Sequence, residues 1–207
     1  MRNKLNSIPE AIQAIKNGEI IIVVDDENRE NEGDFVCASS AIDSEKINFM
    51  TKEGRGLICC SLESSRCEDL DLELMVGKNT DIYGTSFTVS VDLKGNGVTT
   101  GISASDRAKT IKALVDDKID ASNFSKPGHI FPLRAIDGGV LRRAGHTEAS
   151  VDLPKLAGLF PSGVICEILN DDGSMARLDN LFKVADKHGL VIISIKDLIK
   201  HKLDIES

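Results

Sequence analysis

The chain has 207 residues, of which 41% are hydrophobic and 28% charged, and its formal net charge is -8. This composition is typical of a globular protein, and the acidic balance, the lack of Trp and the single Tyr83 argue against nucleic-acid binding, which depends on clustered cations and aromatic stacking. No apolar run approaches the roughly 20 residues of a membrane helix and the first residues lack the apolar core of a signal peptide, so we expect one cytoplasmic domain over residues 1–207, without membrane contact.

The cysteines give no sign of a zinc site or a disulfide framework, because no two of them form a CxxC pair. We expect most of them to be reduced core residues. Cys59 and Cys60 are neighbours in a predicted strand, where successive side chains face opposite ways, so only one of them can face a given site. The five are Cys37, Cys59, Cys60, Cys67 and Cys166.

Helix and strand signals alternate in the first half of the chain. Ser7 and Glu10 form a capping box, which predicts a helix that ends at Gly18, and Ser44 is the predicted cap of a second helix that ends at Gly54. Apolar runs predict buried strands at residues 19–24, 35–38 and 57–62. Residues 63–84 are polar and irregular, so we expect mainly a loop there, the most mobile part of the chain.

The second half continues this alternation. The pattern of SFTVSV predicts a half-buried strand at residues 86–91, and Ser105 is the predicted cap of the next helix. The prolines of PGHIFPL, residues 127–133, exclude a helix and favour an edge strand or an extended loop. Strands are predicted at residues 163–169 and 191–194, and helices at residues 178–188 and 195–200. The interleaved elements predict an α/β or α+β domain, with helices packed around a mixed sheet.

The densest charge of the chain lies in DDENRENEGD, residues 25–34, directly after an apolar run. Six of its ten residues are carboxylates and one is Arg29. Negative charge at the end of a buried strand is costly unless it is neutralised, and a divalent cation bound by hard oxygen ligands would neutralise it. A solvated acidic loop explains the local pattern equally well.

The segment RAGHT, residues 143–147, has the character of an anion site. Gly145 allows close approach of the backbone, free amides at a helix N-terminus bind phosphate oxygens, and Arg143 can add a bidentate contact. His146 or Thr147 is a predicted helix start, although Pro154 would kink this helix or shift its start to follow Asp152. A phosphorylated substrate suits this arrangement.

Two further residues are candidates for acid–base chemistry. Glu167 lies inside the apolar strand GVICEIL, where it either points out of a sheet face or is buried. Burial moves a carboxyl group toward the near-neutral titration that a general acid or base needs. His129, between Gly128 and Ile130, has a weaker case, because it can simply bond a backbone carbonyl.

Six sequence blocks, in this order and with these gaps, strongly resemble the 3,4-dihydroxy-2-butanone 4-phosphate synthases of riboflavin biosynthesis: DDENRENEGD, GRGLIC, FTVSVD, GVTTGISASDRAKTI, PGHIFPLRA and RAGHTEASVDL. The resemblance covers roughly residues 9–199. It implies the fold of that family and a lyase that converts D-ribulose 5-phosphate to L-3,4-dihydroxybutan-2-one 4-phosphate and formate, by enolisation, skeletal rearrangement and excision of C4. It also implies a Mg²⁺ cofactor, with Mn²⁺ as the alternative, and a homodimer with active sites at the subunit interface.

The resemblance also implies roles for single residues. Glu30 and His146 match the metal ligands, and Glu167 matches an essential acid or base. His129 matches a histidine needed for activity, which is expected to reach across the dimer interface. The implied substrate-binding residues are Arg29, Glu30, Asp34, Arg143, Ala144, Gly145, His146, Thr147 and Glu167.

The remaining carboxylates of the acidic stretch have lesser expected roles. Asp25 and Glu32 would help to shape the site, whereas Asp26 and Glu27 are expected to be solvated. Many relatives carry a fused GTP cyclohydrolase II domain, and since this chain ends at Ser207 we expect a monofunctional protein.

Two functions of other classes are alternatives to the synthase. A noncatalytic module that binds a phosphosugar or a nucleotide on the same scaffold would bind its ligand tightly without turnover. A nucleic-acid-binding protein related by fold is disfavoured by the acidic balance of the chain.

Overall fold

The computed structural model of the chain describes residues 4–206. Within these residues the backbone forms a mixed sheet of seven strands in the order β4-β5-β3-β6-β2-β1-β7. Strands β1 and β7 pair in parallel, as do β3 and β5, and the other neighbours are antiparallel. The strands are β1 (Ile21–Val24), β2 (Gly33–Ala38), β3 (Cys59–Leu62), β4 (Val91–Leu93), β5 (Phe124–Arg134), β6 (Ser162–Glu167) and β7 (Ile192–Ser194). The predicted mixed sheet is confirmed.

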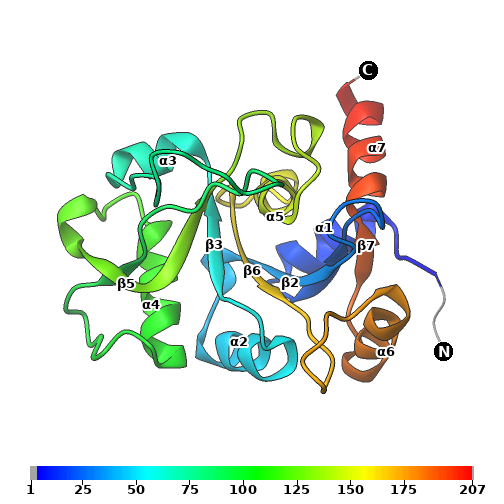
Figure 1. The fold of residues 1–207 in the computed structure, drawn as a ribbon, viewed down its shortest axis with the longest axis horizontal. Coiled ribbons are helices and arrows are strands. Elements are labelled where there is room, and N and C mark those ends of the chain that lie inside the picture. Colours follow the sequence, from blue (N-terminus) through cyan, green and yellow to red (C-terminus); the bar gives the residue numbers. More distant parts are fainter. Residues whose placement is uncertain (1–3, 207) are drawn as a thin grey trace.

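Helices cover both faces of this sheet (Figure 1). One face packs against α1 (Ile8–Lys16), α5 (His146–Leu156) and α7 (Ile195–Glu206), which share a buried core with alternate strand residues such as Val23, Val36 and Ile165. The other face packs against α2 (Ser44–Phe49), α3 (Ser64–Asp69), α4 (Ala104–Leu114) and α6 (Leu178–His188). Because both faces are covered, apolar side chains alternate into two cores along each strand.

Local sequence signals account for several helix ends. The capping box of Ser7 and Glu10 is present at the start of α1. Gly189, in the left-handed conformation with φ 66°, closes α6 as predicted. Within residues 4–206, no helix is both long and apolar enough to cross a membrane.

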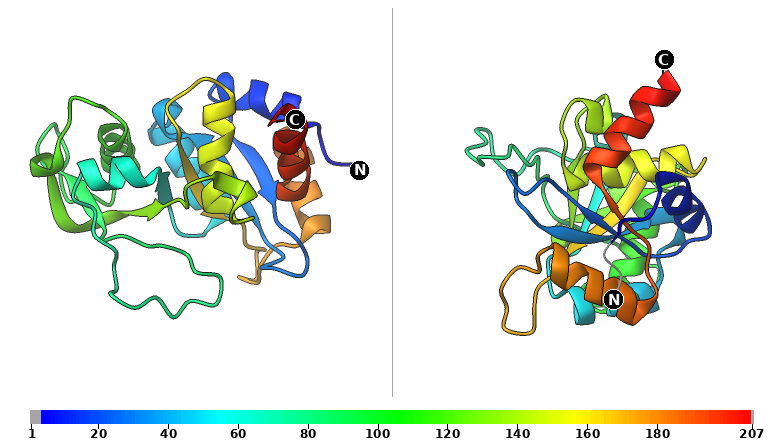
Figure 2. Two further views of the ribbon diagram at one scale, coloured as in Figure 1. Left: turned by 90° about the horizontal axis from the view of Figure 1, so that it is seen from above. Right: turned by 90° about the vertical axis from the view of Figure 1, so that its right-hand side faces the viewer.

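Several predicted elements differ from the observed ones. Residues 63–84 are mainly loop, as predicted, but they begin with a helix that was not predicted, α3; the rest projects as a long arch (Figure 2). The strand predicted at residues 86–91 is instead β4, which begins at Val91, and the preceding residues make only isolated bridges. Strand β5 is not an edge strand, because β4 pairs with its outer side. The N-caps of α2 and α4 are Asp43 and Ser103, one and two residues earlier than expected.

Helix α5 begins at His146, so Pro154 does not shift its start. Pro154 lies in the last turn of the helix, where the backbone bond that it cannot donate is far from the first turn. The first turn, which carries His146 and Thr147, therefore keeps a regular helical backbone.

Close packing of α5 on the sheet depends on Gly163 in β6. A Cβ atom at Gly163 would overlap the carbonyl oxygen of Ser150 in α5. We expect Gly163→Ala to lower the free energy of unfolding by about 1–3 kcal/mol, since the helix must shift to make room. Urea denaturation measures this effect, and Gly77→Ala is the matched control because a Cβ atom there meets no atom within 4 Å. Equal stability of the two variants would contradict the close approach.

Candidate active site

A cavity of about 200 Å³ opens on the α5 side of the sheet. It is lined by the N-terminus of α5, by residues of β2, β3, β5 and β6, and by the acidic loop, residues 25–32 between β1 and β2. The sequence-predicted residues that line it are Arg29, Glu30, Asp34, Arg143, His146, Thr147 and Glu167. The fold therefore brings together residues from distant parts of the chain, as the resemblance required.

Sheet register places the two strand carboxylates of the site side by side. Asp34 in β2 pairs with Val23 in β1 on one side and with Glu167 in β6 on the other. Since paired residues of neighbouring strands point to the same face, both carboxylates face the cavity. Burial raises the pKa of Asp34 to about 7, and the nearby carboxylate of Glu167 adds to this shift.

The imidazole of His146 is fixed between the sheet and the acidic loop. Its Nε2 lies 3.1 Å from the carbonyl oxygen of Val23, and its Nδ1 lies 3.6 Å from Oε2 of Glu30. Burial alone would lower the pKa of His146, but the surrounding carboxylates of Asp34, Glu30 and Asp25 outweigh it and raise the pKa to about 9. The ring therefore carries a positive charge beside Glu30 when no cation is bound.

Asp25 organises the acidic loop from within. Its side chain is fully buried and accepts hydrogen bonds from the backbone amides of Glu30 and Glu32 and from Nη1 of Arg29. Arg29 also bonds Glu30 at 2.6 Å. The carboxylates of this loop are thus not a uniformly solvated group, although Asp26 and Glu27 are exposed as expected.

The residues present fit a divalent cation. Asp25, Glu30 and His146 each offer a ligand atom, and these atoms lie within 4.8 Å of one another. The Nε2 hydrogen bond to Val23 orients the ring as backbone carbonyls orient metal-binding histidines, leaving Nδ1 toward Glu30. Hard oxygen ligands with one imidazole suit Mg²⁺ or Mn²⁺. Because Asp25 already accepts three hydrogen bonds, Glu30 and His146 are the better ligands of the three.

Glu167 faces the cavity, and one of its carboxylate oxygens is hydrogen-bonded to the backbone. Its Oε2 accepts a hydrogen bond of 2.8 Å from the amide of Leu57, which leaves Oε1 for a ligand. A Cβ atom at Gly56 would overlap this carboxylate, so glycine makes room for the contact. The sequence left open whether this side chain points out of a sheet face or is buried; it points from the sheet face into the cavity and is partly buried.

Arg143 joins the start of α5 to the arch after α3. Its Nη1 bonds the buried carboxylate of Glu148 at 2.6 Å, and its other nitrogens donate to the carbonyl of Tyr83 and the hydroxyl of Thr85. A Cβ atom at Gly145 would overlap the Arg143 guanidinium, so Gly145 leaves space for it. Gly145 and Ala144 are not among the residues that line the cavity.

His129 lies outside the cavity, on β5. Its Nδ1 is 2.6 Å from Oδ2 of Asp92, and its backbone amide bonds the other oxygen of that carboxylate. The side chain is 43% exposed. In this chain, His129 therefore does not join Glu30 and Glu167.

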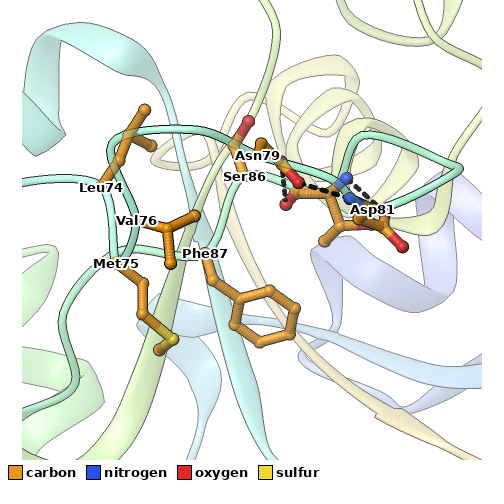
Figure 3. A pocket seen from close by; sticks show the side chains of 8 residues that line it. Leu74, Met75, Val76, Asn79, Asp81, Ser86 and Phe87 are labelled. Atoms are coloured by element: carbon orange, nitrogen blue, oxygen red, sulfur yellow. Dashed lines mark hydrogen bonds between the residues drawn. The ribbon is translucent and has the colours of Figure 1, made fainter.

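Three residues at the end of the arch or just after it belong to the site but were not predicted. Thr85 and Phe87 line the cavity, and Tyr83 stacks on Arg29, with the guanidinium carbon 5.2 Å from the ring centroid. The arch is ordered by Asn79 and Asp81, and Figure 3 shows a second pocket beneath it, with Leu74, Met75, Val76 and Phe87 on one side. The single Tyr of the chain was the available signal.

All five cysteines are free and buried, as expected. Cys59 lines the cavity, whereas Cys60 belongs to the opposite core. Burial raises the pKa of the Cys59 thiol well above its usual range, so it is not a ready nucleophile.

Known proteins are similar to this chain in both sequence and fold. The family model of 3,4-dihydroxy-2-butanone 4-phosphate synthase matches residues 9–201. The chain belongs to this family. The predicted family and the predicted fold are both confirmed.

Relatives within the synthase family are close. The chain is 62% identical over 204 residues to riboflavin biosynthesis protein RibBA of Cytophaga hutchinsonii, a match that covers 99% of the chain and 50% of that protein. It is 56% identical over 194 residues to 3,4-dihydroxy-2-butanone 4-phosphate synthase of Agrobacterium fabrum, covering 94% and 91%. The chain thus spans about half the length of the RibBA relatives that it matches.

Solved structures of synthases superimpose closely. A crystal structure of a 3,4-dihydroxy-2-butanone 4-phosphate synthase in complex with two magnesium ions matches with a TM-score of 0.94 and 44% identity, covering 98% of this chain and 99% of that one. The synthase of Candida albicans matches with a TM-score of 0.88 and 46% identity, covering 96% and 98%.

Proposed function

We propose that the chain converts D-ribulose 5-phosphate to L-3,4-dihydroxybutan-2-one 4-phosphate and formate, with Mg²⁺, or Mn²⁺ in its place, as cofactor. The observation that carries this proposal is the cavity itself, which holds the candidate ligands Glu30 and His146 beside the carboxylates of Asp34 and Glu167. These residue types suit the reaction for which the family of this chain is named. A crystal structure of another 3,4-dihydroxy-2-butanone 4-phosphate synthase contains two magnesium ions.

Proton transfer in the cavity falls to Glu167. The reaction begins with loss of a proton beside the ketone, and Oε1 of Glu167 is the oxygen that the Leu57 amide leaves for this task. Asp34, its neighbour on β2, binds the sugar together with Arg29. When bound at Glu30 and His146, a divalent cation would polarise the ketone and hydroxyl oxygens of the sugar.

The phosphate end of the substrate fits the start of α5. Gly145 is the N-cap and makes no side-chain cap bond, so backbone amides of the first turn remain for phosphate oxygens. Arg143, held by Glu148, and Thr147 line the cavity next to these amides. We therefore assign phosphate binding to residues 143–147.

Release of formate tests this function. Purified protein incubated with D-ribulose 5-phosphate and Mg²⁺ is expected to release formate in equal amount to the sugar consumed. Chelation with EDTA is expected to stop the release, and Mg²⁺ or Mn²⁺ to restore it. Binding of the sugar phosphate without formate above a blank would instead support the noncatalytic module.

His129 leads to a proposal about subunits. Its side chain is half exposed, outside the cavity, and held by Asp92, as suits a histidine that serves the site of a second copy. We propose a homodimer in which His129 completes the partner's active site.

Subunit complementation tests this arrangement. His129→Ala and Glu167→Gln are each expected to be inactive, but a mixture of the two, after exchange of subunits, should recover about a quarter of wild-type formate release, because half of the dimers then contain one intact site. Formate release is measured before and after mixing. No recovery, despite exchange of differently tagged subunits, would place His129 in its own subunit's site.

A further inference from the structure

Glu30 faces His146 only if the acidic loop keeps one conformation. Asp25 fixes the backbone amides of this loop but not its carbonyl oxygens. Asp25 accepts the backbone amides of Glu30 and Glu32 from the buried side. The carbonyl oxygens of Glu30 and Asn31 can accept hydrogen bonds of their own, and Asn31 has a left-handed backbone, with φ 55°.

Arg177 donates these hydrogen bonds from the solvent side. Its Nη1 donates to the carbonyl oxygen of Glu30 at 3.0 Å and also to that of Asn31. Arg177 is the N-cap residue of α6, and this helix is seated on the sheet at the base of the loop, where a Cβ atom at Gly33 would overlap Leu181. One guanidinium thus ties a rigid helix to the two peptides that follow Glu30 and Asn31.

We propose that Arg177 is a positioning residue for the metal site. It holds the Glu30–Asn31 backbone so that the Glu30 carboxylate faces His146, and it acts through Glu30 without touching the substrate. This inference rests on the proposed metal role of Glu30 and His146. Together, Asp25 on the buried side and Arg177 on the exposed side clamp the loop.

Charge and geometry make opposite predictions for Arg177. Removing a positive charge close to a cation site strengthens binding of a divalent cation by Coulomb attraction alone. Removing the clamp weakens binding, because Glu30 is no longer held toward His146. The sign of the change in metal affinity therefore separates the two effects.

Direct binding of Mn²⁺, followed by the loss of its free electron paramagnetic resonance signal, measures this sign without substrate. We expect Arg177→Met to weaken Mn²⁺ binding about 10- to 100-fold, as changes to residues that orient metal ligands do. Arg177→Lys keeps the charge and one donor nitrogen, on a shorter side chain, and is expected to give a smaller loss. KM for Mg²⁺ in the formate assay should rise in parallel.

Lys187→Met is the matched control for a merely structural effect. Lys187 lies near the other end of α6 and bonds Glu53 at 2.8 Å, so its loss loosens the same helix without touching the acidic loop. We expect its Mn²⁺ affinity to equal that of the wild type. Equal weakening in Lys187→Met and Arg177→Met would overturn the clamp, since general loosening of α6 would then explain both.

The outcomes separate this inference from the proposed function. Wild-type affinity in Arg177→Met, or tighter binding, overturns the clamp alone if the wild-type protein binds Mn²⁺ and Glu30→Gln does not. Absence of Glu30-dependent Mn²⁺ binding in the wild type overturns the metal site and the clamp together. Thermal denaturation of each variant shows that it is folded, and Arg177→Lys replaces Arg177→Met if the latter is not.

Discussion

Glu167→Gln is expected to lower the rate of formate release at least about 100-fold, because a positioned acid or base contributes 10²–10⁴ to such a reaction. Glutamine has the shape of glutamate and can still accept the hydrogen bond from the Leu57 amide. The fold and the binding of D-ribulose 5-phosphate should therefore persist, and the loss should appear in kcat rather than in KM. Steady-state formate release and calorimetric binding of the sugar phosphate measure the two quantities.

Glu45→Gln provides the matched control for this change. Glu45 is an exposed residue in the first turn of α2, so the same substitution there should leave kcat unchanged. If Glu167→Gln turned over at the wild-type rate, proton transfer by Glu167 would be wrong. If the variant instead failed to bind the sugar phosphate, Glu167 would be a binding residue only.

Glu30→Gln should weaken binding of the cation, whereas Glu167→Gln should slow proton transfer. The amide removes the negative charge that faces Nδ1 of His146, so we expect Mn²⁺ affinity to fall at least about 10-fold. At fixed low Mg²⁺, formate release should fall about 100-fold, since a metal ion supplies several kcal/mol to such steps. Raising the Mg²⁺ concentration should recover part of the rate, which distinguishes this variant from Glu167→Gln.

The acidic loop itself contains the control for Glu30→Gln. Glu27 lies three residues earlier, carries the same charge and is exposed. Glu27→Gln should keep the wild-type dependence on Mg²⁺. A Glu30→Gln variant with the same Mg²⁺ dependence as Glu27→Gln would show that overall loop charge, and not the Glu30–His146 pair, attracts the cation.

Elements with a local hydrogen-bond or periodic signature were predictable from the sequence. The capping box at Ser7 and the closing glycine at Gly189 mark helix ends because the bonds that define them join residues close in the chain. Of the candidate residues, Glu167 was identifiable because it interrupts an apolar strand, and His146 because it lies at a predicted helix start beside Gly145. Glu30 was singled out from the acidic stretch only by the family resemblance.

Tertiary contacts decided the elements that were not predicted. Helix α3 has no clear periodicity, but its Arg66 is buried and donates to the carbonyl oxygens of Leu114, Asp116 and Ile119, residues far along the chain. The alternating residues 86–90 pair only through isolated bridges, of Phe87 with Leu133 in β5 and of Thr88 with Leu74, and the regular strand β4 begins at Val91. Neither contact has a signature in the local sequence.

The assembly of the site was beyond local prediction for the same reason. Cys59 rather than Cys60 faces the cavity, a choice set by the pairing of β3 with β6 and β5. Only the position of β6 between β3 and β2 sets Glu167 beside Asp34. The family resemblance predicted that Glu167 and Asp34 belong to one site, whereas periodicity and spacing alone did not.

The place of β6 in the sheet also orders the events of synthesis. The ribosome releases β2 and β3 well before β6, so both strands have an open edge until the chain reaches Ser162–Glu167. A nascent chain that already carries the acidic loop and α5 still lacks Glu167. Insertion of β6 closes the two edges and sets Glu167 beside Asp34 in one event, so we expect incomplete chains to lack the proposed proton-transfer group and to be prone to pair with their neighbours.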